Sequence, residues 1–364
     1  MSPDRPVRHE HPYARLPDRH FWRRTAAAWA AGEAGDIYRP KFSIDRDTPI
    51  ATAGSCFAQH VTRALRKAGC NLLDVEPAPG LLPPDRWADF GYGLYSARYG
   101  NIYTARQLRN LVEAALGRRA IEEAWEQGGR WFDPMRPAIE PGGFGSEEEM
   151  RALRRAHHAA IRRLIEQAGL LVFTLGLTEC WMNAVEGHAY PVCPGTVAGE
   201  FDPARHIFRN LTVAEVVEDL RAVLALGREV NPALRLLLTV SPVPLVATAT
   251  DAHVVVATAQ AKAVLRAAAA EVAAGDPGVD YFPSFELVTS HLSGDCFEAD
   301  RRNVRAGAVE RVMACFLGAC GLGVPVEALP SAAGPAEAED ADEAEAMRVI
   351  CDEVEIDPEL ASAR

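Results

Sequence analysis

Short apolar runs alternate with amphipathic segments along this chain, and this alternation constrains the fold more strongly than any other feature. Four runs predict buried strands, at 49–53, 170–177, 234–244 and 279–288. Apolar residues at three- and four-residue steps predict helices at 57–68, 104–117, 147–169, 212–232, 253–275 and 305–321. Strands that alternate with helices form a parallel sheet covered on both faces. The sequence therefore predicts an α/β protein, a three-layer α/β/α sandwich with a central parallel sheet, flavodoxin-like in arrangement.

Three segments divide the chain. Residues 45–322 contain the predicted sandwich, and residues 1–44 read as a charged, proline-rich arm with a short helix at 21–33. Residues 323–364 form an acidic tail, because twelve Asp and Glu against two Arg follow from Glu327 onward. Such a low-complexity, self-repelling stretch predicts a mostly disordered tail without fixed contacts. Within it, 345–356 has the pattern of one short amphipathic helix.

Composition excludes several classes of function. The tail carries −10 of the net charge of −12, so the remaining body is nearly neutral and offers no basic field for nucleic acid. No apolar run reaches the ~18–20 residues of a membrane span, and the polar N-terminus lacks a signal-peptide pattern, which favours a cytoplasmic protein. Eight scattered cysteines, without C-x-x-C, predict no disulfide frame. We expect no metal and no cofactor, since metal-ligand spacing and phosphate-binding glycine motifs are absent. The oligomeric state is not readable.

The turn after the first strand carries the sharpest candidate for chemistry. Ser55 stands between Gly54 and Cys56, directly before a helix. Glycine permits a tight turn, and free N–H groups at a helix N-terminus stabilise a developing oxyanion, so Ser55 can be a nucleophile. Serine before a helix is also a common N-cap, which is the alternative. Cys56 has the same two interpretations, nucleophile or small buried residue.

Five stretches carry a family resemblance. They are GSCFA at 54–58, YGNIYTARQL at 99–108, FTLGLTECW at 173–181, LTVSPVPLVAT at 238–248 and YFPSFE at 281–286. Together, from about residue 50 to 316, they resemble the GSCFA family, which is similar to the SGNH, or GDSL-like, esterases and acyl hydrolases. The resemblance implies an SGNH-hydrolase-like sandwich and a serine esterase site.

The first three blocks of the SGNH group supply the nucleophile and the oxyanion hole. The resemblance places the nucleophile on Ser55 and an oxyanion-hole glycine on Gly100, with Asn101 beside it. The third block, G-x-N-D, corresponds to 176–179, where Thr178 replaces the asparagine and Glu179 follows. Asn183, one turn further on, is a possible substitute donor. Trp181 is suited either to stack on a sugar ring or to pack at the rim.

The fourth block departs from the family pattern. Its D-x-x-H sequence corresponds to 300–303, where Asp300 is present but Asn303 stands in place of the histidine. Asparagine cannot accept and return a proton near neutral pH. His253 and His291 are the better substitute bases, because their elements should end at the carboxyl edge of the sheet. His60 and His188 are weaker candidates.

Two functions follow from these residues. One is a serine-dependent esterase or acyltransferase whose substrate is an acylated carbohydrate or similar small ester. The other is a catalytically impaired module that binds an acylated glycan or a protein partner without turnover. The acyl group and the acceptor are not readable from the sequence.

Overall fold

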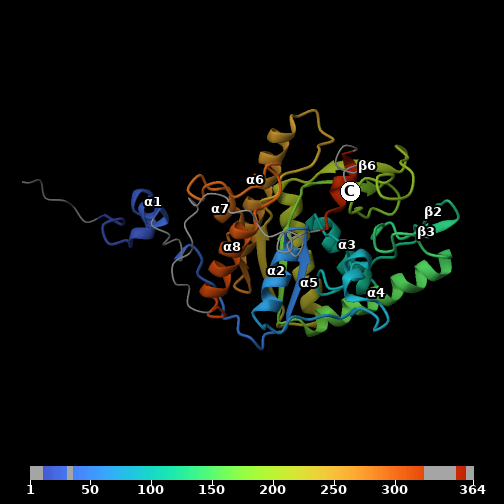
Figure 1. The fold of residues 1–364 in the computed structure, drawn as a ribbon, viewed down its shortest axis with the longest axis horizontal. Helices are drawn as coiled ribbons and strands as arrows, with labels where there is room; N and C mark the ends of the chain where they lie inside the picture. Colours follow the sequence, from blue (N-terminus) through green and yellow to red (C-terminus); the bar gives the residue numbers. More distant parts are fainter. Residues whose placement is uncertain (1–10, 31–35, 324–349, 358–364) are drawn as a thin grey trace, which may run out of the picture.

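The computed structural model describes residues 11–30, 36–323 and 350–357 (Figure 1). Its centre is a four-stranded sheet in the order β1-β4-β7-β8, and every neighbouring pair is parallel. The strands are β1 (Ile50–Gly54), β4 (Leu170–Leu175), β7 (Arg235–Val240) and β8 (Val279–Tyr281). This confirms the predicted α/β class and the central parallel sheet. All four strands end at one edge, where ligands bind in open parallel sheets.

Helices cover both faces of this sheet, as Figure 1 shows. Alternate strand residues point to opposite faces, so Phe173 and Leu238 join one core while Val172 and Leu237 join the other. The first core is completed by α3 (Ala105–Ala115), α4 (Glu147–Gln167), α5 (Val213–Val230) and α6 (Val254–Gly275). The second is completed by α2 (Ala58–Lys67), α7 (Ser284–Thr289) and α8 (Ala306–Ala319). The arrangement is the predicted three-layer sandwich.

Local sequence signals account for several helix boundaries. Thr104 and Thr212 cap α3 and α5 through their side chains, and Glu215 completes a capping box with Thr212. Prediction was less accurate beyond residue 281, because the expected strand at 279–288 stops at Tyr281 and α7 follows. The break falls before Pro283, which lacks the N–H that a strand pairing needs.

Two small antiparallel hairpins lie outside the main sheet. The first joins β2 (Trp125–Gln127) to β3 (Arg130–Phe132), and the second joins β5 (Glu179–Asn183) to β6 (His206–Asn210). The sequence indicated only a loop at 178–184. Residues more than twenty positions away provide the pairing partner of β5, and a local pattern does not reveal such a contact.

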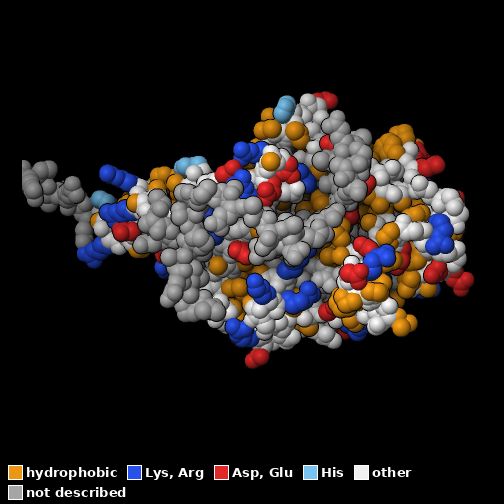
Figure 2. Space-filling model, in the orientation of Figure 1, with side chains coloured by type: hydrophobic (Ala, Val, Ile, Leu, Met, Phe, Trp, Pro, Cys, Tyr) orange, Lys and Arg blue, Asp and Glu red, His pale blue; other side chains and the backbone are white. Residues whose placement is uncertain are grey.

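The N-terminal region contributes α1 (Trp22–Ala30), at the left of Figure 1. The helix predicted over 21–33 agrees with it as far as Ala30, while residues 31–35 lie outside the described part of the chain, as do 1–10. Among the described residues, no helix is long and apolar enough to cross a membrane. On the face shown in Figure 2, the coloured basic and acidic side chains are interspersed.

The acidic tail differs in part from its prediction. Residues 324–349 and 358–364 lie outside the described residues, so the predicted disorder there is not addressed. Residues 350–357, which include the 3₁₀ helix η5 (Asp352–Ile356), instead make fixed contacts with the body. Their side chains are not all acidic, and Cys351 is 4% exposed. Burial of such a side chain against a complementary surface can offset the repulsion between carboxylates.

Candidate active site

The turn between β1 and α2 holds Ser55 at the carboxyl edge of the sheet. Gly54 has a φ of +145°, and a Cβ at this position would lie 2.6 Å from the main-chain oxygen of Thr174 on β4. Only glycine therefore fits between the two strands. The backbone N–H of Ser55 donates to this Thr174 oxygen at 3.1 Å, and the Ser55 carbonyl accepts from Ala58 N–H at 2.8 Å. These bonds fix the serine between strand and helix.

The Ser55 side chain does not act as a helix cap. The N-cap residue of α2 is Phe57, and no side chain caps the helix there. Ser55 is 2% exposed, and its Oγ has no hydrogen-bond partner among the residues described. A buried hydroxyl without a partner is costly, and such groups occur where function requires them. The geometry leaves the hydroxyl unengaged, as a nucleophile requires.

The loop after β4 packs directly on this serine. A Cβ on Gly176 would lie 2.8 Å from Cβ of Ser55, so glycine is needed for the close approach. The backbone N–H groups of Gly176 and Leu177 both donate to the carbonyl of Tyr103 at 3.0 Å. The three loops that follow β1, precede α3 and follow β4 are thereby joined around Ser55.

A buried amide lies beside the serine turn. The Tyr95 hydroxyl oxygen is 2.6 Å from Asn101 Oδ1 and 3.1 Å from the Ser55 carbonyl oxygen. Gln59 Nε2, on the first turn of α2, is 3.3 Å from both Asn101 Oδ1 and the Tyr95 hydroxyl. With Oδ1 engaged in this way, Asn101 Nδ2 points towards the C-terminal segment, where it donates to the Ile350 carbonyl at 3.1 Å and to Asp352 Oδ2 at 3.0 Å. Asn101, predicted near the oxyanion, is therefore linked to Ser55 through Tyr95.

A groove of about 890 Å³ opens beside this amide. Its lining includes Gly100, Asn101, Phe90, Phe132 and Arg63, together with Ile350 and Asp352 of the C-terminal segment. Gly100 has a φ of +67°, and a Cβ there would meet nothing within 4 Å. The mixture of aromatic and charged walls suits a ligand that has both polar and apolar parts.

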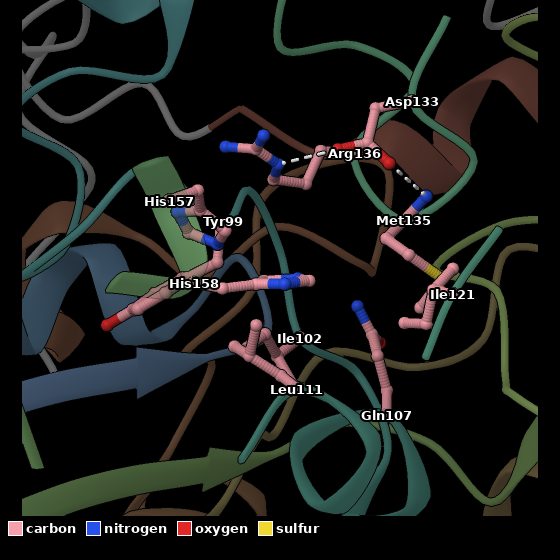
Figure 3. Close-up of a pocket in the computed structure, with 10 residues that line it drawn as sticks. All are labelled: Tyr99, Ile102, Gln107, Leu111, Ile121, Asp133, Met135, Arg136, His157 and His158. Atoms are coloured by element: carbon pink, nitrogen blue, oxygen red, sulfur yellow. Dashed lines mark hydrogen bonds and ion pairs between the residues drawn. The ribbon is translucent and has the colours of Figure 1, made fainter. Parts of the chain in front are cut away.

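A second, much smaller cavity is lined by Tyr99 and Ile102, the residues on either side of Gly100 and Asn101 in the sequence (Figure 3). Tyr99 and His157 lie next to each other on one side of it, while Asp133 and Arg136 lie together on another. Its volume of about 20 Å³ is room for about one water molecule. Arg136 bonds Asp133 at 3.0 Å and the carbonyl of Arg98 at 3.1 Å. This network holds the main chain at Arg98, shortly before the Gly100–Asn101 turn. The cavity itself is too small to receive a substrate.

Lys262 of α6 contacts the loop that packs on the serine. Its Nζ donates to the main-chain oxygen of Gly176 at 2.8 Å, and the residue is 4% exposed. Within the described residues, no carboxylate lies in ion-pair distance of this ammonium group. Burial lowers the pKa of Lys262 to about 8, although the Glu353 carboxyl opposes the shift. A substantial neutral fraction of this amine is therefore available at mildly alkaline pH.

The fourth-block residues turn away from the serine. Asn303 is exposed, and its Nδ2 donates to Asp300 Oδ2 at 2.6 Å while its backbone N–H donates to Asp300 Oδ1 at 2.9 Å. Arg302, between them, points inward instead and reaches Cys351 Sγ at 3.5 Å and Glu353 Oε2 at 3.4 Å. The block thus brings a guanidinium group, and not the expected acid and base pair, towards the cleft.

The candidate histidines make contacts of their own. His253 is exposed and caps α6, accepting from Val255 N–H at 3.2 Å. His291 is exposed, and its ring lies 5.5 Å from that of Trp22 on α1. His60 is buried, which lowers its pKa to about 3. No hydrogen bond joins any of these rings to Ser55 in the described structure, and their role as base stays a prediction.

The residues after β4 belong to a separate network. Thr178 Oγ1 donates to Asn210 Oδ1 at 2.7 Å, and Glu179 accepts from the Thr248 hydroxyl at 2.6 Å. Asn183 Nδ2 donates to Glu123 Oε2 at 2.9 Å, and Trp181 packs at 5.0 Å from the Phe201 ring. His188 Nε2 also lies 3.0 Å from Glu123 Oε2. These partners occupy the polar groups that were predicted to face the substrate.

Sequence reasoning missed four side chains that the structure brings towards Ser55. They are Gln59, Lys262, Arg302 and Glu353. Lys262 could have been singled out from the sequence, because the chain has only three lysines and this one lies inside an alanine-rich predicted helix. The other three become recognisable only when distant segments are brought together.

Comparisons with known proteins place the chain in a family. No curated protein matches it. A solved structure, a carbohydrate esterase family 3 from Talaromyces cellulolyticus, is similar with 9% identity and a TM-score of 0.35, covering 74% of this chain and 94% of that one. The model of the GSCFA family matches residues 49–316, which include the serine turn, the Gly100–Asn101 loop and Lys262. On this match the chain belongs to the GSCFA family.

Proposed function

We propose that this protein is a serine-dependent esterase or acyltransferase with Ser55 as its nucleophile, acting on an acylated carbohydrate or similar small ester. One observation carries the proposal: the Ser55 hydroxyl is buried at the carboxyl edge of the sheet, lacks a partner among the described residues and caps no helix. The mixed groove at Gly100 and Asn101 supports a polar ester, since it adjoins this turn.

Backbone N–H groups near Ser55 would stabilise the oxyanion. The N–H of Ser55 itself is engaged by Thr174, so it is not the donor. The N–H groups of Cys56 and Phe57 have no acceptor in the described structure, and they lie at the start of α2, where the helix dipole favours negative charge. The N–H of Gly100 offers a further donor, and the Asn101 Nδ2 group would offer another once the C-terminal residues that it binds are displaced.

Lys262 would accept the proton in place of the missing histidine. The Ser55 oxygen attacks the acyl carbon, its proton passes to neutral Lys262, and that proton leaves with the alcohol as the ester bond breaks. Water or an acceptor hydroxyl then attacks the acyl-serine and gives up its proton to Lys262. That proton returns to Ser55 Oγ as the acyl–serine bond breaks, which releases the acid or the new ester and restores free Ser55 and neutral Lys262. Serine paired with lysine is an established alternative to serine paired with histidine. His253 or His291 remains the alternative base.

A panel of short-chain aryl esters and acetylated sugars tests this function. We expect the full-length chain to release acyl groups and Ser55→Ala to lose the activity. Ser293→Ala is the matched control, because Ser293 is also a buried serine whose Oγ has no partner within the described residues. Equal turnover by Ser55→Ala and the unmodified chain would contradict the proposal.

A second candidate is the binding module without turnover. It is favoured by the fourth block, where Asn303 takes the histidine position and its amide is held by Asp300 at the surface. For this candidate we expect acetylated sugars to bind in calorimetry while no ester in the panel is hydrolysed.

A further inference from the structure

Residues of the C-terminal segment 350–357 line the groove beside Asn101. We infer that this segment is an internal ligand of the cleft, held by a carbonyl-binding site that the side-chain amides of Gln59 and Asn101 form. The consequence for catalysis rests on the proposed function, whereas the binding itself does not.

The carbonyl-binding site is defined by three hydrogen bonds. Gln59 Nε2 donates to the carbonyl oxygen of Ile350 at 2.7 Å, and Asn101 Nδ2 donates to the same oxygen at 3.1 Å. The Ile350 N–H donates back to Gln59 Oε1 at 3.0 Å. Gln59 therefore hydrogen-bonds both the N–H and the carbonyl oxygen of Ile350, as a neighbouring β-strand would. With the segment in place Gln59 is 0% exposed and Asn101 is 3% exposed, so these hydrogen bonds are shielded from water.

The residues that follow anchor the segment more deeply. Asp352 accepts from Asn101 Nδ2 at 3.0 Å, and its N–H donates to the Tyr103 hydroxyl at 3.2 Å. Glu353 is 6% exposed and lies 3.4 Å from Arg302. Side-chain amides thus bind the Ile350 carbonyl and the Asp352 carboxylate, the Tyr103 hydroxyl binds the Asp352 N–H, and the Arg302 guanidinium group faces Glu353. This sequence of partners selects an acidic peptide.

The Cys351 side chain brings the segment against the serine turn. Its Sγ is hydrogen-bonded to Cys56, the residue after Ser55, and lies 3.6 Å from the Tyr103 hydroxyl. The hydrogen bond from Cys56, with the Arg302 guanidinium, lowers the pKa of Cys351, although burial opposes the shift. Ser55 is 2% exposed in this arrangement. A substrate carbonyl that used Asn101 would meet the Ile350 carbonyl already bound there, so ester and segment compete.

Thiol labelling of the full-length chain tests the docking without reference to catalysis. The chain is treated with a maleimide, and labelling at each cysteine is followed by mass spectrometry. Cys351 and Cys56, which are 4% and 2% exposed, should be protected. Cys70, which is half-buried on the body, should label readily, and Cys315, which is 5% exposed in α8, should not. Rapid labelling of Cys351 in the unmodified chain would overturn the inference.

A proline at residue 350 provides the release variant. Ile350→Pro removes the N–H that donates to Gln59 and leaves every body residue unchanged. We expect Cys351 and Cys56 to label at least about tenfold faster, while Cys315 stays protected and so reports that the body is folded. Should Cys315 also become reactive, Arg302→Met serves as the second release variant. Unchanged labelling in a folded release variant contradicts the inference.

Adding the segment back as a peptide completes the test. A synthetic peptide of residues 346–357 should restore the protection of Cys56 in the Ile350→Pro chain, whereas the same peptide with proline at 350 should not. If neither peptide protects Cys56, the proposed carbonyl-binding site is wrong.

Ester turnover separates this inference from the proposed function. If both hold, Ile350→Pro should raise kcat/KM at least about tenfold, and the peptide should reverse the gain. Protection by the peptide without any ester turnover would support the internal ligand and contradict the esterase. Turnover that the release variant does not change, together with an unprotected Cys351, would support the esterase and contradict the internal ligand.

Discussion

Lys262 Nζ donates a hydrogen bond to the main-chain oxygen of Gly176, the residue that packs against the Cβ of Ser55. The ammonium group and the Ser55 side chain therefore share Gly176 as a neighbour, although α6 and the serine turn are some two hundred residues apart. A buried lysine without an ion-pair partner in the described structure is costly, which indicates a role other than stability.

Lys262→Met should lower kcat by about 10²–10⁴, the usual contribution of a general base. In the unmodified chain, the rate should rise with pH through about 8, because the amine accepts a proton only when it is neutral and burial lowers its pKa to about 8. The measurement is kcat/KM against pH on an aryl ester whose chemistry limits the rate. A rise centred near ~6.5, the ordinary histidine value, would point to His253 or His291 instead.

Asn303→His should change kcat by less than about threefold. The Asn303 side chain is exposed and bonded to Asp300, so an imidazole placed there would not meet the serine hydroxyl. Steady-state kinetics on the same ester provide the measurement. An increase of about 10²–10⁴ would show that the lost base belonged at this position.

Gly54→Ala should destabilise the fold by about 3 kcal/mol or more, since its Cβ would lie 2.6 Å from a main-chain oxygen of β4 and its φ of +145° is unfavourable for alanine. Gly307→Ala is the matched control. Gly307 lies in α8, and a Cβ there would meet nothing within 4 Å, so this change should be neutral or stabilise by up to ~1 kcal/mol. Urea unfolding of both variants tests the difference, and equal midpoints would contradict it.

Glu123 should make stability depend on acid pH. Burial alone would raise its pKa, but hydrogen bonds from His188, Tyr190 and Asn183 lower it to about 2. The stabilisation is therefore present above the unfolded value of about 4.5 and is lost as pH falls from there towards 2. In Glu123→Gln, the melting temperature should fall less between pH 4.5 and about 2 than it does in the unmodified chain. An unchanged acid dependence would rule out this carboxylate as its source.

The family and the serine turn were accessible from the sequence because both depend on local information. GSCFA at 54–58 combines a glycine that the strand pairing requires with a serine and a helix start, and these residues are consecutive. The roles of Thr178 and Asn183 were harder to predict, since each has a partner on a segment that the motif does not contain. For the base, the sequence pointed to His253 and His291. It did not indicate that Lys262 of α6 contacts the loop that packs on the serine turn.

The sequence by itself determined the alternation of strands and helices, and hence the three-layer sandwich with Ser55 at a strand end. Periodicity determines which face of an element is apolar, and apolar faces must be buried. Only the tertiary structure decided what surrounds that serine: the amides of Gln59 and Asn101, the Lys262 amine, and the Ile350 carbonyl from a tail that composition described only as acidic. These contacts join segments up to about 290 residues apart. They depend on directional hydrogen bonds between particular atoms, which hydrophobic patterning does not encode.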